Sequence, residues 1–124
     1  MEYRLLACDL DGTLIRDDLT MSPRVRRALE SAMSRGIQLI LASGRSYRSL
    51  EAWVRELSLE SPVIAYQGAA VVDPATGMRL YQHCFPREIG YRVVDFGRAH
   101  RLELALFVDD EIYVENKIHD DGFY

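Results

Sequence analysis

The sequence predicts an α/β protein with a Rossmann-like parallel sheet and helices on both faces of that sheet. Two apolar runs, residues 3–8 and 37–42, have the length and continuity of strands buried in a parallel sheet. Between them, a helix is expected to begin at Ser22-Pro23 and to end at Arg35-Gly36, because serine and proline favour helix starts and glycine favours helix ends. A strand, a helix and a strand in this order form a right-handed crossover unit.

The later elements continue this pattern along the chain. A second helix is expected over residues 47–57, where apolar residues recur at helical spacing. A third strand is expected over residues 62–66 and a turn over residues 67–70. Two short strands, over residues 71–74 and 77–81, are expected on either side of an Asp-Pro-Ala-Thr-Gly turn. After Pro86 we expect a helix to His100, a strand over residues 102–108, a turn at Asp109-Asp110 and a returning strand over residues 112–114.

Composition and charge exclude several classes of protein. The chain has 124 residues, of which 48% are hydrophobic and 27% charged, as in an ordinary globular domain. Its formal net charge of −4, with no basic stripe, argues against a nucleic-acid partner. No run is long enough for a transmembrane helix, and the N-terminus leads into a strand rather than a signal peptide. We therefore expect a cytoplasmic protein without a membrane partner. Cys8 and Cys84 are too few to indicate a disulfide framework or a metal site.

The segment Asp9-Leu10-Asp11-Gly12-Thr13 has the composition expected of a reaction centre. Asp9 stands at the carboxyl end of the first strand, where open α/β sheets bind their ligands. Both acids can face that end only if the chain leaves extended geometry near Gly12. A carboxylate can accept a phosphoryl group, which makes Asp9 the candidate nucleophile of an aspartyl-phosphate mechanism. Asp11 is then the candidate proton donor to the leaving group and the later base for water.

The two acids also indicate a metal ion. Carboxylates this close in sequence repel each other unless a cation neutralises them. Oxygen ligands with no cysteine or histidine nearby suit Mg²⁺, so Asp9 and Asp11 are the candidate metal ligands. The competing interpretation is a polar turn that merely follows a strand.

Ser43-Gly44-Arg45 is a candidate phosphate-binding segment. It follows the second strand and precedes a helix, where a hydroxyl, main-chain N–H groups and the helix dipole can hold an anion. Alternatively, Ser43 or Ser46 simply caps the helix. Because this segment and the acid pair follow adjacent parallel strands, the phosphate interpretation is favoured.

Residues 9–14, 41–45 and 64–69 together resemble three motifs of the haloacid dehalogenase-like phosphatases, and most closely the Cof-like branch with an inserted α/β cap. The resemblance implies that Asp9 is the nucleophile and that Asp11 is the acid/base, whose backbone carbonyl also binds Mg²⁺. It further implies that Ser43 binds the transferring phosphoryl group of a small phosphorylated metabolite. Residues 1–83 would then be the N-terminal part of the core domain, and residues 84–124 the beginning of the cap.

Two departures from the family pattern are visible. Gln67 stands where this branch usually has Asn, in a loop with Gly68 that the resemblance places beside the substrate. The family also needs a downstream Lys and a Gly-Asp segment, and neither Lys117 nor the His-Asp-Asp-Gly segment at residues 119–122 stands in the right place. We therefore expect an N-terminal part of a longer protein that is inactive alone. Its first strand would present an open apolar edge over residues 5–8 for self-association or a complementing segment.

Two other functions compete with the phosphatase. A receiver-like signalling domain would carry its phosphoacceptor at the third strand, but that strand ends in Tyr66-Gln67-Gly68 with no Asp. A non-catalytic remnant would keep the motifs and turn nothing over. Reading the coding frame beyond Tyr124 distinguishes a remnant from an enzyme.

Overall fold

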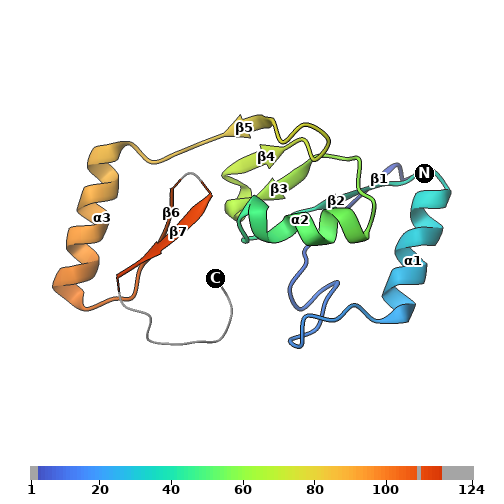
Figure 1. Ribbon diagram of the computed structural model, residues 1–124, viewed down its shortest axis with the longest axis horizontal. Coiled ribbons are helices and arrows are strands. Elements are labelled where there is room, and N and C mark those ends of the chain that lie inside the picture. The colour runs from blue at the N-terminus through green and yellow to red at the C-terminus, as the bar shows by residue number, and fades with distance from the viewer. Residues whose placement is uncertain (1–2, 109, 116–124) are drawn as a thin grey trace. The chain divides into compact units, whose positions relative to one another are not determined.

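The computed structural model describes residues 3–108 and 110–115, and its ribbon is shown in Figure 1. The chain divides into two compact units, Met1–Gln82 and His83–Tyr124. The elements of the first unit are β1 (Leu5–Cys8), α1 (Pro23–Ser34), β2 (Gln38–Leu41), α2 (Tyr47–Glu56), β3 (Val63–Ala65), the 3₁₀ turn η1 (Tyr66–Gly68), β4 (Ala70–Val72) and β5 (Arg79–Gln82). The elements of the second unit are α3 (Arg87–His100), β6 (Ala105–Val108) and β7 (Glu111–Val114). The assignment of the two units to a core domain and a cap stays a prediction.

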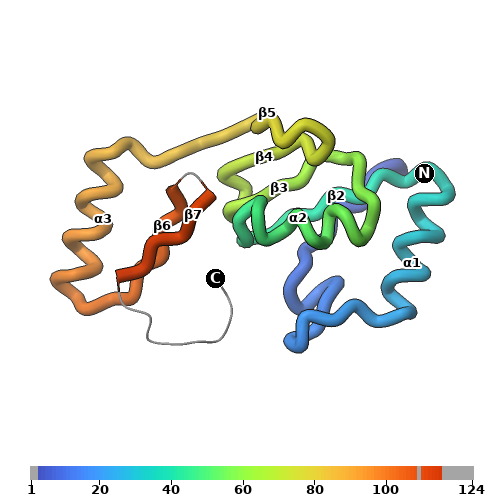
Figure 2. Tube along the Cα trace, in the orientation of Figure 1, coloured from blue at the N-terminus to red at the C-terminus, as the bar shows by residue number. Residues whose placement is uncertain are grey.

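The first unit is built on a parallel pair of strands. β1 pairs with β2 in parallel register, from Leu5 opposite Gln38 to Cys8 opposite Leu41. A parallel bridge between Ala42 and Ile64 links the end of β2 to β3, so β2 has β1 on one side and β3 on the other. Figure 2 traces the path of the chain through β2, β3 and β4. β3, β4 and β5 form an antiparallel sheet. The predicted α/β class, with a parallel sheet and helices, is confirmed.

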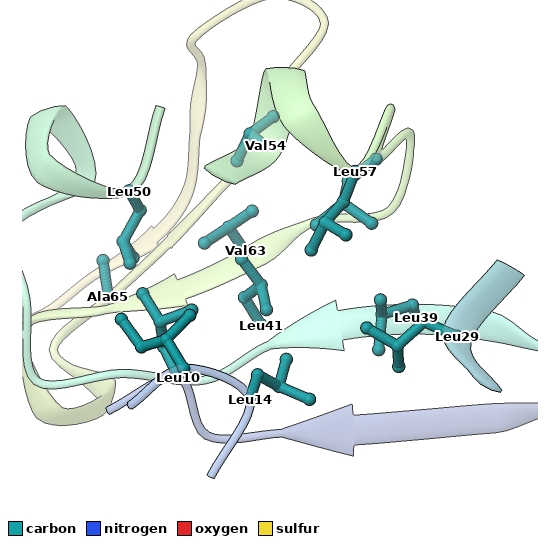
Figure 3. Packing of buried hydrophobic residues seen from close by; sticks show 12 residues of the cluster. Leu10, Leu14, Leu29, Leu39, Leu41, Leu50, Val54, Leu57, Val63 and Ala65 are labelled. Atoms are coloured by element: carbon teal, nitrogen blue, oxygen red, sulfur yellow. The ribbon is translucent and has the colours of Figure 1, made fainter. Parts of the chain in front are cut away.

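Burial alternates along the inner strands and defines one packed face. Ile40 and Ile64, on the opposite face, are only half-buried. α1 lies against β2 and α2 against β3, and both contribute side chains to a single hydrophobic cluster (Figure 3). The fully or nearly fully buried members from these elements and from the C-cap of α2 are Leu29, Leu39, Leu41, Leu50, Val54, Leu57, Val63 and Ala65. The apolar faces of the two helices therefore cover the sheet that supports the predicted site.

The ends of α1 follow the signals in its sequence. The Ser22 hydroxyl accepts a hydrogen bond from the Val25 N–H at 3.2 Å, and Pro23 occupies the first turn. Past the other end, Gly36 adopts a φ of +81°, which glycine tolerates without strain. Both predicted boundaries are confirmed to within a residue or two.

The first strand departs from the expectation that it is buried on both faces. Leu5 is 50% and Leu6 37% exposed, and Ala7 is exposed as well. Within the described residues β1 pairs only with β2, and α1 and α2 lie against other strands. β1 therefore presents the open apolar edge that was expected over residues 5–8. Self-association through this edge stays a prediction.

The second unit holds one helix and one hairpin. β6 and β7 pair antiparallel, with Ala105 opposite Val114. Gly97 of α3 is buried, and a Cβ at this position would lie 2.3 Å from Leu104, so the glycine permits a close approach. Asp109 of the predicted turn, Lys117 and residues 119–122 lie outside the described residues. None of the described helices combines the length and the apolar character needed to cross a bilayer.

Candidate active site

The acid loop is anchored by the residue between the two acids. The side chain of Leu10 has 0% exposure and lies in the hydrophobic cluster, close to Ala65 and Leu41 (Figure 3). Its carbonyl oxygen accepts N–H groups from the three residues at positions 13–15, at 3.3, 2.9 and 3.0 Å. Gly12 has a φ of +70°, so the chain leaves extended geometry at the expected place. With Leu10 in the core, Asp9 is exposed and Asp11 is partly buried.

Asp9 is exposed at the end of β1. Among the described residues, its carboxylate accepts one long hydrogen bond, from the Thr13 hydroxyl at 3.3 Å. That contact leaves most of the lone pairs of the carboxylate open to a ligand. The position and accessibility are those that an attacking carboxylate or a metal ligand requires.

Asp11 is bound by Arg45 through both of its carboxylate oxygens. The Arg45 Nε donates to Oδ2 at 2.8 Å and Nη2 donates to Oδ1 at 2.6 Å. Both side chains are partly buried, with exposures of 18% for Arg45 and 30% for Asp11. The hydrogen bonds and charge of Arg45 hold the pKa of the Asp11 carboxyl below its ordinary value, against the opposing effect of burial. The sequence pattern predicted that Arg45 lies at a phosphate and gave no sign of this ion pair.

The two serines of the loop after β2, Ser43 and Ser46, make different hydrogen bonds. Ser46 is the N-cap of α2, because its hydroxyl accepts from the Ser49 N–H at 3.3 Å. Ser43 does not cap the helix: its hydroxyl oxygen accepts from the Arg45 N–H at 3.2 Å, and its own N–H donates to the Ile64 carbonyl at 2.9 Å. Of the two possible caps, the structure selects Ser46. Within residues 3–108 and 110–115 the Ser43 hydroxyl accepts this hydrogen bond and donates none, so its hydrogen can serve another acceptor.

The third loop is held against the second by its main chain. The Tyr66 N–H donates to the Arg45 carbonyl at 2.9 Å, and the Gln67 N–H donates to the Ser43 carbonyl at 3.2 Å. Tyr66 and Gln67 have φ values of +53° and +55°, which cost conformational energy in residues other than glycine. Gly68 follows with a φ of +91°. Such strain persists where the surroundings over-determine the backbone, as these two hydrogen bonds do.

The side-chain amide of Gln67 lies directly over Gly44. A Cβ on Gly44 would clash with the Gln67 Nε2 atom, so this exposed and flexible side chain would have to move aside for any larger residue. Nothing in the sequence predicts this contact, because the two residues lie in different loops with no characteristic spacing between them.

The structure thus joins the three predicted segments. The Ser43–Arg45 loop contacts the acid loop through the Arg45 side chain and the third loop through its main chain. No hydrogen bond among the described residues links Asp9 directly to Ser43.

No group of three or more His, Cys, Asp or Glu side chains in the described residues is arranged to hold a metal. The donors are oxygens from two acids, a set that fits Mg²⁺, which commonly takes one or two carboxylates with water and phosphate.

Comparison with known proteins identifies the family. The sequence family described as haloacid dehalogenase-like hydrolase matches residues 6–123, so the chain belongs to this family. It is 38% identical over 118 residues to the putative phosphatase YxeH of Bacillus subtilis, covering 93% of this chain and 44% of the relative. It is also 28% identical to the pyridoxal phosphate phosphatase YbhA of Escherichia coli, covering 94% of the chain and 43% of that protein.

Solved structures agree with this membership. A haloacid dehalogenase-like hydrolase from Bacteroides thetaiotaomicron superposes with a TM-score of 0.79 at 27% identity, over 95% of this chain and 46% of the other. The resemblance drawn from the three motifs is confirmed. The chain spans less than half the length of these relatives.

Proposed function

We propose that the protein is a Mg²⁺-dependent phosphatase that hydrolyses a small phosphorylated metabolite through an aspartyl-phosphate intermediate. The observation that carries the proposal is the meeting of two loops at one end of the parallel β1–β2 pair. One loop offers the exposed Asp9 carboxylate and the other offers Ser43, which lies between the end of β2 and the N-cap of α2. Parallel strands bring such loops to the same sheet edge, where α/β proteins bind ligands.

The reaction would proceed in two displacements. The Asp9 carboxylate attacks phosphorus and the ester P–O bond breaks, while Asp11 gives its proton to the departing oxygen. Water then attacks the phosphoryl group on Asp9, Asp11 takes a proton from that water, and inorganic phosphate leaves. The Ser43 hydroxyl and the Gly44 N–H would bind phosphoryl oxygens during both steps. Gln67 and Gly68 lie beside this loop and would face the substrate.

The metal would be held by Asp9 and Asp11. Because both side-chain oxygens of Asp11 bind Arg45, the main-chain carbonyl of Asp11 is the better donor beside the Asp9 carboxylate. When bound, Mg²⁺ would neutralise negative charge on the phosphoryl oxygens and on the acids.

The named relatives support the substrate class. One is a pyridoxal phosphate phosphatase, and another is a 5-amino-6-(5-phospho-D-ribitylamino)uracil phosphatase, YitU of Bacillus subtilis, 29% identical over 109 residues. Both names describe phosphate esters of small molecules. The cytoplasmic location stays a prediction. We expect the described segment alone to be inactive, because positioning and charge neutralisation supply most of the catalysis of phosphoryl transfer.

The test uses the protein expressed from its complete reading frame. We expect phosphate release from p-nitrophenyl phosphate that is abolished by a chelator and restored by Mg²⁺. Asp9→Asn should remove turnover, whereas Asp73→Asn, the same change in an exposed turn, should retain it. Turnover that survives Asp9→Asn would exclude Asp9 as the nucleophile.

A non-catalytic remnant, which would keep the three motifs and turn nothing over, is the second candidate. A reading frame that continues past Tyr124 into a Lys and a Gly-Asp segment supports the phosphatase, and an immediate stop supports the remnant.

A further inference from the structure

We propose that Arg45 is a positioning residue that orients the Asp11 carboxyl group toward the leaving group, and that it does not bind the phosphoryl group. This inference rests on the proposed function. It concerns the same site but gives Arg45 a role in proton transfer instead of phosphate binding.

The contact has the geometry of a fixed support. Two donors of one guanidinium reach two oxygens of one carboxyl group, at 2.8 and 2.6 Å. Such fork-to-fork pairs restrict both the distance and the plane of the carboxyl group, and charge assistance makes them stronger than neutral hydrogen bonds. A protonated carboxyl group still accepts a hydrogen bond on its carbonyl oxygen. The guanidinium can therefore hold Asp11 in both of the protonation states that the reaction needs.

The backbone of the acid loop fixes where Asp11 begins but leaves its side-chain torsions to be set by other contacts. The turn at Gly12, with a φ of +70°, is closed by hydrogen bonds to the Leu10 carbonyl, and these do not reach the Asp11 carboxyl group. Leu10 fixes the chain on the other side, but its side chain lies in the core. The plane of the Asp11 carboxyl is thus set from another loop, by a residue 34 positions away.

Arg45 is itself held in place, as a support must be. Its N–H donates to the Ser43 hydroxyl at 3.2 Å, and its carbonyl accepts from the Tyr66 N–H at 2.9 Å. The next residue, Ser46, is 3% exposed and caps α2. Both main-chain groups of Arg45 are therefore fixed, and its side chain extends from this base to the acid loop.

The two possible roles of Arg45, positioning Asp11 and binding the phosphoryl group, predict different effects when Arg45 is replaced. A phosphate ligand would place guanidinium donors on the phosphoryl group, including those that the fork to Asp11 does not use, and its loss would weaken every phosphate ester alike. A positioning residue keeps its Nε and Nη2 donors on Asp11. Loss of a positioning residue lowers the rate only for substrates whose leaving oxygen needs a proton. A weakly basic leaving group departs without one, so its rate does not depend on the general acid.

The experiment compares two substrates of similar shape in the protein from the complete reading frame. p-Nitrophenyl phosphate has a good leaving group, and phenyl phosphate has a more basic one. The quantity measured is kcat/KM, which reports the steps up to departure of the leaving group. For Arg45→Met we expect kcat/KM on phenyl phosphate to fall roughly 10²-fold, the usual size of a general-acid contribution, with a far smaller fall on p-nitrophenyl phosphate.

Two further variants test whether Arg45 acts through Asp11. Asp11→Asn should show the same substrate dependence, and the double variant Asp11→Asn/Arg45→Met should be no worse than Asp11→Asn alone. Arg55→Met is the matched control, since Arg55 lies in α2 at 73% exposure and pairs with Glu51 on the surface. It should match the wild type on both substrates.

Equal losses on both substrates, or additive losses in the double variant, would overturn the inference and make Arg45 a phosphate ligand. If Arg45→Met does not fold, Arg45→Lys keeps the charge without the fork and should show the same substrate dependence at smaller size. A wild-type protein that is inactive on both substrates would refute the proposed function and this role with it. Uniform losses in an active enzyme would refute only the role.

Discussion

The buried side chain of Leu10 anchors the acid loop, and replacement of Leu10 by alanine tests this anchoring role. The residue is 0% exposed and stands between Asp9 and Asp11. Its contacts lie in the cluster that contains Leu41, Leu50 and Ala65 (Figure 3). Leu10→Ala removes those contacts without touching either carboxylate.

The expected loss has a stability part and an activity part. A fully buried leucine replaced by alanine costs about 3 kcal/mol, within a usual range of about 2–5 kcal/mol, because a cavity remains where the side chain was. This corresponds to roughly a 10²-fold change in the folding equilibrium. In the folded molecules the two acids lose their anchor, and a displacement of about 1 Å at a reacting group can cost on the order of 10²-fold in rate.

The assay measures both parts on the same protein. Urea unfolding followed by the fluorescence of Trp53, which packs against the cluster, reports stability, and phosphate release from p-nitrophenyl phosphate reports activity. Leu29→Ala is the matched control, because Leu29 is 5% exposed and lies beside Leu39, away from the acid loop (Figure 3). It should lose a similar amount of stability and keep its kcat/KM.

Two results would refute the reasoning. Equal kcat/KM in Leu10→Ala and Leu29→Ala, measured on folded protein, would mean that the backbone hydrogen bonds to the Leu10 carbonyl hold the loop without its side chain. A stability loss below about 1 kcal/mol would contradict the burial of Leu10.

Two further predictions concern pH and association. The Thr76 hydroxyl and the Ala75 N–H donate to the Asp73 carboxylate at 2.7 and 3.0 Å and hold the pKa of Asp73 below its ordinary value. A folded-state pKa below the unfolded one stabilises the protein above the unfolded value of about 3.9, and this contribution is lost as pH falls through the folded pKa. The difference in unfolding free energy between wild type and Asp73→Asn should therefore be smaller at about pH 3 than at about pH 7, and a constant difference would contradict the turn contacts. Residues 1–124 expressed alone should self-associate through β1, and Leu6→Lys should shift sedimentation toward the monomer, because lysine on an edge strand opposes pairing. A cooperative wild-type monomer would show that the edge is not an association site.

The sequence by itself predicted the order of the elements and the family. Helix signals and apolar periodicity are local, so α2 was expected over residues 47–57 and is observed over Tyr47–Glu56. The Asp9-Leu10-Asp11-Gly12 spacing is equally local, and it predicted both the acid pair and the turn at Gly12.

Only the tertiary structure decided how the loops engage one another. Arg45 binds Asp11, Gln67 fills the space over Gly44, and Tyr66 takes a left-handed backbone, because each depends on a neighbour from a different part of the chain. The exposure of β1 has the same origin: an apolar run predicts that a strand can be buried, but burial depends on what lies beside it. Sequence patterns record what a segment favours, and contacts between distant segments determine which side chains face each other at the site.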